Sequence, residues 1–205
     1  MDTQKGYKLD NMAVAYFELG NSYYYGNENT EVDTEKALAF YQKAAECGYA
    51  PAYEQIGNIY YLSDNIPGAI SAFENAVQAD RFWCYCNLGI IYGFDEVYKD
   101  LYKEKSSWDN FFARAGAMIS MTDDPSQYYT TLFANIFNYY LIYCDEPRLK
   151  EQLPFFRKHK THLMRFAESM IDITSHQDSV NKYTNFLLFL KRGLQRKQKS
   201  LRGVL

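Results

Sequence analysis

Proline and glycine are scarce in this chain, at 5 and 11 of 205 residues. Sheets linked by many tight turns need more of both, so the shortage favours long helices over many short strands. Because 47% of the residues are hydrophobic and 23% are charged, the chain can bury a substantial core. Global disorder is thereby excluded.

Long apolar runs are missing as well. The longest stretches that are both uncharged and apolar, such as 139–144 and 186–190, are far shorter than the roughly 20 residues that cross a bilayer. Residues 1–5 show no apolar segment of the kind found in secretory signals. We therefore expect a cytoplasmic protein that makes no use of a membrane.

The usual marks of catalysis and of metal binding are absent too. Of the four cysteines only Cys84 and Cys86 lie close together, and no second pair stands at zinc-ligand spacing. His159 and His162 are flanked by cations, which favours a solvated basic face over a metal site. No glycine-rich phosphate loop and no sequence context of an activated nucleophile is recognisable. We predict reduced, mostly buried thiols, no cofactor, no metal and no enzymatic activity.

Aromatic residues, by contrast, are abundant, with 20 Tyr, 14 Phe and 2 Trp. Many of them recur at fixed positions of a repeat in the first half of the chain. In each repeat, an apolar residue, a glycine and a tyrosine one turn later mark the first helix of a helix pair. In the second helix, small residues let the helices approach and an aromatic fills the gap between pairs. The first-helix segments are Leu19-Gly20-x-x-Tyr23, Ile56-Gly57-x-x-Tyr60 and Leu88-Gly89-x-x-Tyr92, and the second-helix sets are Ala37, Tyr41, Ala44, then Ala69, Phe73, Ala76, then Trp108, Phe112, Ala115.

The first repeat resembles a known family. Its motif is Ala15-x-x-x-Leu19-Gly20-x-x-Tyr23-x-x-Gly26 followed by Lys36-Ala37-x-x-x-Tyr41-x-Lys43-Ala44-Ala45-x-x-Gly48-x-Ala50. This pattern resembles a Sel1-like repeat, the variant of the tetratricopeptide repeat that has a longer interhelical loop. Residues 52–79 resemble an ordinary tetratricopeptide repeat, and a third unit begins at Trp83 and carries a charged loop from Asp95 to Lys105.

The resemblance implies an all-α fold, an α-solenoid of antiparallel helix pairs with a C-terminal capping helical region. We expect Sel1-like and tetratricopeptide repeats over residues 11–120. Degenerate repeats or capping helices, continuous with the first part, are expected over 121–205, because a repeat stack needs its terminal apolar face covered.

In this architecture the first helices line a concave surface. Asn21 and Asn58 share one repeat position, and an amide there can bond an extended peptide backbone through both its donor and its acceptor. Tyrosine adds contact area at low entropic cost. The alternative is that the asparagines bond neighbouring helices and the tyrosines pack between units. The expected partner-binding set is Phe17, Asn21, Tyr24, Tyr25, Glu54, Asn58, Tyr61, Trp83, Cys86 and Ile90.

Charge is divided unevenly along the chain. Residues 1–147 hold 9 Lys and Arg against 21 Asp and Glu, for a net −12, whereas residues 148–205 hold 13 against 4, for a net +9. The acidic part suggests a basic or mixed partner segment, and the two-ended charge makes a homodimer an alternative. The basic end could meet nucleic acid or an anionic membrane, but the acidic remainder would repel phosphate. Its cations are Lys191, Arg192, Arg196, Lys197, Lys199 and Arg202.

These observations favour a non-catalytic helical-repeat module that binds a protein or peptide through its concave surface. Proteins similar to this act as adaptors, regulators or neutralisers of toxins, as the resemblance implies. One alternative is a cytoplasmic immunity protein that occludes the active site of a toxin. The other is a nucleic-acid-associated regulator that uses the basic C-terminal helix.

Overall fold

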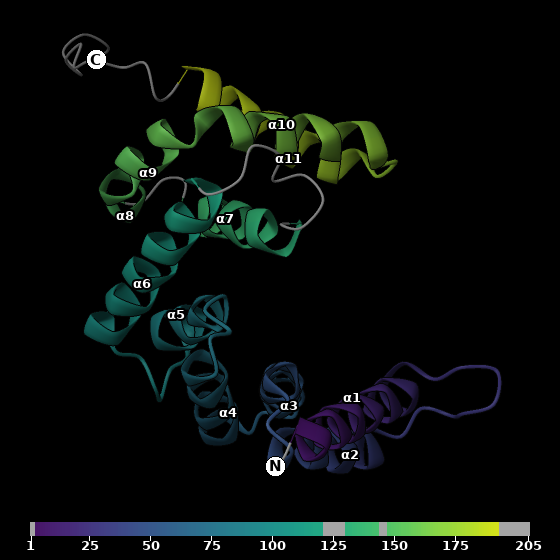
Figure 1. The fold of residues 1–205 in the computed structure, drawn as a ribbon. Helices are drawn as coiled ribbons and strands as arrows, with labels where there is room; N and C mark the ends of the chain where they lie inside the picture. The colour runs from purple at the N-terminus through teal and green to yellow at the C-terminus, as the bar shows by residue number, and fades with distance from the viewer. Residues whose placement is uncertain (1–2, 121–129, 144–146, 193–205) are drawn as a thin grey trace, which may run out of the picture. The chain divides into compact units, whose positions relative to one another are not determined.

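A computed structural model describes residues 3–120, 130–143 and 147–192. Every regular element in this part of the chain is a helix, and β pairing is limited to an isolated bridge between Asn27 and Thr30. The chain divides into two compact units, residues 1–111 and 112–205 (Figure 1). The predicted boundary at residue 120 stays a prediction, since the units divide inside a helix.

Unit 1 contains α1 (Thr3–Tyr25), α2 (Thr34–Glu46), α3 (Ala50–Leu62), α4 (Ile66–Gln78), α5 (Cys84–Phe94) and the first half of α6 (Leu101–Ser120). From α1 to α5, each helix packs against the next in chain order (Figure 1). This order of contacts confirms the predicted all-α solenoid. The charged loop expected over 95–105 is shorter than predicted, because α6 already begins at Leu101.

The second helix of each pair begins with the same side-chain cap. A carboxylate or amide oxygen accepts a hydrogen bond from the backbone N–H three residues later, which satisfies one of the unpaired donors of a helix start. The capping oxygens lie on Asp33, Asn65 and Asp100, at 2.9, 3.1 and 3.0 Å from the nitrogens of Lys36, Gly68 and Lys103. The three caps stand at the same position of the three repeats of unit 1.

Eight residues after each cap stands a buried aromatic that faces a glycine of the first helix. An added Cβ at Gly20, Gly57 or Gly89 would come within 2.6, 2.6 and 2.7 Å of the rings of Tyr41, Phe73 and Trp108 respectively. No side chain fits at such a distance, so the aromatic contact requires glycine. The three glycines therefore lie at equivalent helix crossings, as the repeat predicted.

The predicted register of the third repeat was wrong by one helical turn. Trp108, and not Phe112, occupies the place of Tyr41 and Phe73. Phe112 belongs to unit 2, where its ring lies 4.7 Å from that of Tyr139 and 4.8 Å from that of Phe155. The residue one turn before Trp108, where the other units have alanine, is the buried Glu104.

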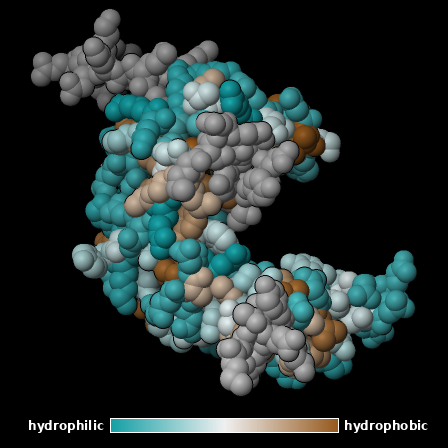
Figure 2. All heavy atoms as spheres, in the orientation of Figure 1, coloured by the Kyte–Doolittle hydropathy of each residue, from teal (hydrophilic) through white to brown (hydrophobic). Residues whose placement is uncertain are grey.

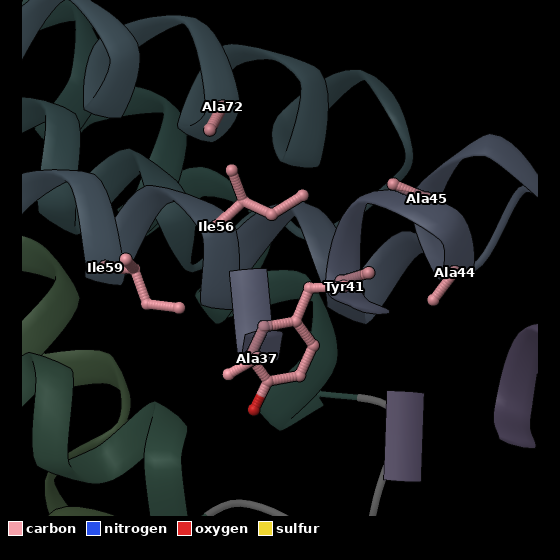
Figure 3. Packing of buried hydrophobic residues seen from close by; sticks show 8 residues of the cluster. Ala37, Tyr41, Ala44, Ala45, Ile56, Ile59 and Ala72 are labelled. Atoms are coloured by element: carbon pink, nitrogen blue, oxygen red, sulfur yellow. The ribbon is translucent and has the colours of Figure 1, made fainter. Parts of the chain in front are cut away.

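The core of the first two units is built around small residues and one large ring. Tyr41 is fully buried, with Ala37, Ile56 and Ile59 in the same cluster (Figure 3). Burial raises the pKa of the Tyr41 hydroxyl, so this group stays protonated and acts as a hydrogen-bond donor.

Unit 2 contains the rest of α6 and α7 (Thr130–Tyr143), α8 (Pro147–Glu151), α9 (Leu153–Lys158), α10 (Lys160–Ile173) and α11 (Gln177–Arg192). The helices α10 and α11 pack as a pair. Phe156, Phe186 and Leu190 are fully buried, as expected for amphipathic helices. The helices α9 and α10 are separated at His159, which ends α9 and precedes α10.

Candidate partner-binding surface

The predicted site residues of the first unit lie on the second half of α1. Tyr25 is 67% exposed, and its ring meets that of Tyr24 edge-on at 4.9 Å. Phe17 is half-buried, with its ring 5.4 Å from Tyr41 and 5.0 Å from Tyr49. Phe17 therefore serves mainly to pack α1 against the following helices, while the two tyrosines are available at the surface.

Asn21 is engaged within the fold. Its side-chain oxygen accepts a hydrogen bond of 2.9 Å from the Tyr41 hydroxyl, and its amide nitrogen lies 3.4 Å from a carboxylate oxygen of Glu18. This is the alternative that the sequence left open for the asparagines, and at Asn21 the structure favours it. The amide that was expected to meet a partner instead ties α1 to α2.

Asn58 stands at the same repeat position but in a different environment. The aromatic that faces it is Phe73, which has no hydroxyl to donate. Among the described residues the Asn58 side chain makes no hydrogen bond, although it is only half-exposed. A half-exposed amide without a protein partner bonds to water, which a partner can displace, so this group is available to an incoming peptide backbone.

A cavity of about 220 Å³ lies beside Asn58. Phe73 and Ile91 form a buried apolar floor, and polar groups come from Asn58 and from Asn87 on α5. Three of the predicted site residues line this cavity together, on two consecutive first helices. The lining is Asn58, Tyr61, Phe73, Asn87, Ile90 and Ile91. Such a site can take an apolar side chain while its amides bond the adjoining backbone.

Glu54 and Trp83 are also brought together, by a residue that sequence reasoning missed. Arg81 lies in the turn between α4 and α5, and its guanidinium stands 3.7 Å above the Trp83 ring. One carboxylate oxygen of Glu54 accepts hydrogen bonds of 2.8 Å from both Arg81 and the Trp83 indole. The Glu54 carboxylate is thus neutralised within the chain and offers little attraction to a basic partner.

Cys86 does not belong to the surface. It is 2% exposed, and burial raises the pKa of its thiol well above the ordinary value. The helix α5 is apolar on nearly every face and is buried along most of its length. The repeat position that is half-buried at Phe17 on α1 is therefore fully enclosed at Cys86. Burial likewise raises the pKa of the Cys84 thiol. Neither cysteine is reactive in the folded protein.

His159 differs from its prediction as well. It was expected on a solvated basic face, but it is 4% exposed, and its ring lies 4.8 Å from that of Phe155. Burial first, then the neighbouring Lys158 and His162, lower its pKa to about 4. His159 is therefore a neutral core residue of unit 2 at physiological pH.

The basic C-terminal end lies largely outside the described residues. Within them, Lys191 stands 3.4 Å from a carboxylate oxygen of Glu168, while the side chain of Arg192 and residues 193–205 are not described. In the described part of the chain, no helix combines the length and the apolar character needed to cross a membrane.

The geometry of the first unit agrees with a family comparison. Residues 13–49 match the family model described as Sel1 repeat. These residues, which include most of α1 and all of α2, form a Sel1-like repeat. Sel1 repeats are helical modules for protein interaction and are generally non-catalytic, and the tetratricopeptide repeat is their coarser relative.

A second family model covers the following part of the chain. Residues 80–189, just over half of the sequence, match the model described as the N-terminal domain of a protein of unknown function (DUF447). The chain belongs to that family, and the description names no activity. Comparisons with curated proteins and with solved structures found no significant match.

Proposed function

We propose that this Sel1-like protein is a non-catalytic adaptor or regulator that holds an extended segment of a partner protein along the first helices of unit 1. The observation that carries the proposal is the cavity beside Asn58, where an unpaired amide borders an apolar pocket. An apolar side chain of the partner fills the pocket, and the amides of Asn58 and Asn87 bond the backbone on either side of it.

The volume of the cavity limits what it accepts. At about 220 Å³ it has room for one large aliphatic or aromatic side chain, and not for a folded loop. Burying such a side chain contributes about 1.5–3 kcal/mol, and each amide hydrogen bond contributes about 1 kcal/mol. The partner segment therefore needs further contacts along α1, where the exposed Tyr25 and the half-buried Tyr24 offer aromatic area.

The test uses affinity capture from native lysate with quantitative mass spectrometry. Ile90→Trp fills the cavity from its wall, whereas Leu62→Trp adds the same side chain at a residue that is 73% exposed and does not line the cavity. We expect a partner retained by the wild type and by Leu62→Trp to be reduced at least tenfold by Ile90→Trp. Asn58→Ala should weaken capture about fivefold, which corresponds to one hydrogen bond.

The proposal fails if Ile90→Trp retains every wild-type partner. Circular dichroism of both tryptophan variants is the necessary control, because a lost partner counts only when the helix content of Ile90→Trp equals that of Leu62→Trp. A partner lost equally from both variants would also count against the cavity as the binding site.

A further inference from the structure

The three repeats of unit 1 can be compared at equivalent positions. Leu19, Ile56 and Leu88 are the apolar residues that directly precede the three equivalent glycines. Ile56 is 7% exposed and Leu88 is 4% exposed, but Leu19 is 43% exposed. The same repeat position is thus covered in the second and third units and open in the first.

The elements that cover this position in the later units are known. Ile56 packs in one cluster with Ala44 and Ala45 of α2, and Leu88 packs in another with Ala69 and Ala76 of α4. In both cases the cover is a second helix that presents small residues. An α-helix of the same kind is therefore the shape that fits over Leu19.

A side-chain hydrogen bond is formed beside Ile56 and beside Leu88, where the second helix covers them. The Gln42 amide of α2 donates to the Tyr60 hydroxyl at 3.3 Å, and the Tyr92 hydroxyl donates to a Glu74 oxygen of α4 at 3.3 Å. Gln42 and Glu74 share one repeat position, nine residues after their caps. Tyr23 is the equivalent tyrosine of the first unit, and among the described residues its hydroxyl has no such partner.

The first unit adds positive charge at this place. The rings of Tyr16 and Tyr23 stack on that of Phe40 at 6.3 and 5.6 Å. Lys43 stands 5.2 Å from the Phe40 ring and 5.7 Å from that of Tyr16, and Lys36 stands 5.4 Å from that of Tyr23. Figure 2 shows hydrophobic side chains among hydrophilic ones over the α1–α2 pair.

These two lysines are the only ones between residues 11 and 98. Lys36 also pairs with Asp33 at 2.9 Å, while Lys43 lies over aromatic rings. Unit 1 as a whole is acidic, with 8 Lys and Arg against 17 Asp and Glu over residues 1–111. Charges farther than about 8 Å are largely screened at physiological salt, so the local lysines determine which helix is attracted.

We propose that the surface formed by Tyr16, Leu19, Tyr23, Phe40 and Lys43, the end face of unit 1, binds an acidic amphipathic α-helix of a partner protein. The partner helix lays small apolar residues over Leu19, as α2 and α4 do over Ile56 and Leu88. A glutamate or glutamine reaches the Tyr23 hydroxyl, and further acidic residues meet Lys43. This surface is separate from the cavity beside Asn58.

The probe is a synthetic peptide with the α4 sequence, residues 66–78, because α4 covers the equivalent row in the third unit. Its outward residues Ser71, Asn75 and Gln78 are replaced by glutamate in one version and by lysine in the other. Binding to the full chain is measured by fluorescence anisotropy. We expect the glutamate peptide to bind the wild type at least tenfold more tightly than the lysine peptide.

Three variants locate the contact. Leu19→Glu should weaken the glutamate peptide at least tenfold, whereas Leu62→Glu, at an exposed leucine of α3, should leave it unchanged. Lys43→Glu should reverse the preference between the two peptides. Leu19 is already 43% exposed, so its replacement leaves the core intact, which circular dichroism verifies.

Several results would overturn the proposal. Equal binding of the glutamate peptide to the wild type and to Leu19→Glu would remove the end face as its site. No preference for the acidic peptide would remove the charge argument. A wild-type dimer that Leu19→Glu converts to a monomer would assign the surface to a second copy of the chain, and displacement of the peptide by a single-stranded oligonucleotide would assign it to nucleic acid.

Discussion

Replacing Gly57 by alanine tests the repeat architecture directly. Within a helix the change from glycine to alanine normally stabilises by about 1 kcal/mol. Here the added Cβ would lie 2.6, 2.7 and 2.9 Å from three carbons of the Phe73 ring, well inside the usual carbon–carbon contact of about 3.5–4.0 Å. Phe73 is 1% exposed and lines the cavity beside Asn58, so its ring can move away from the added methyl group only by giving up its own packing in the core and filling that cavity.

The two effects oppose each other, and the clash prevails. Overpacking of a tight core costs about 1–3 kcal/mol, and three contacts shorter than 3 Å with a buried ring put this position at the upper end. Subtracting the gain in helix propensity leaves a net loss of about 2 kcal/mol for Gly57→Ala. The expected change in melting temperature is a decrease of about 4–8 °C for a chain of this size.

The measurement is urea unfolding followed by circular dichroism, with Phe73→Leu as the second arm of a double-mutant cycle. If the clash is the cause, Phe73→Leu makes room for the methyl group, and the double variant should be at least about 1 kcal/mol more stable than the sum of the single changes. A Gly57→Ala protein as stable as the wild type, or more stable, would refute the proposed crossing.

Three further changes have effects that follow from single contacts. Glu54→Ala leaves the Arg81 guanidinium and the Trp83 indole without their shared acceptor, so urea unfolding should show a loss of about 2–3 kcal/mol; an unchanged midpoint would contradict this. Tyr41→Phe removes one buried hydroxyl donor and should cost about 1 kcal/mol by the same measurement, with helix content preserved. The pKa of His159 is lowered from 6.5 to about 4, so the unfolded chain takes up a proton first, and stability is full above pH 6.5 and falls as the pH drops towards 4. The loss should approach at most about 3 kcal/mol, and His159→Gln should flatten it; an identical pH profile for the variant would exclude this histidine as the cause.

The repeat could be predicted from the sequence wherever both helices of a pair kept their spacing. In the first two units the glycine and the aromatic agreed, and Gly20 and Gly57 lie where the pattern placed them. The third unit was misaligned because Ala115 resembled the small residue after the aromatic. The better signal was Asp100, which stands eight residues before Trp108 as Asp33 does before Tyr41.

The candidate site was harder to predict because it depends on single atoms in neighbouring helices. Asn21 and Asn58 occupy one repeat position, yet the hydroxyl of Tyr41 engages the first, and its absence from Phe73 leaves the second available. No repeated sequence pattern indicates the role of Arg81, which lies in a turn and neutralises Glu54. A repeat pattern gives positions, whereas the partners of polar groups depend on which residue each unit places there.

The two proposed surfaces should act independently, and a pair of variants tests this. Leu19 lies on α1, whereas the cavity beside Asn58 is lined by residues of α3, α4 and α5. Leu19→Glu should therefore weaken the acidic helical peptide without affecting the partner captured at the cavity, and Ile90→Trp should do the reverse. The double variant should lose both ligands, each by the same factor as in its single variant, because distant sites add within about 0.5 kcal/mol. If Leu19→Glu instead reduces capture of the cavity partner as strongly as Ile90→Trp does, one ligand spans both faces and the division into two sites is wrong.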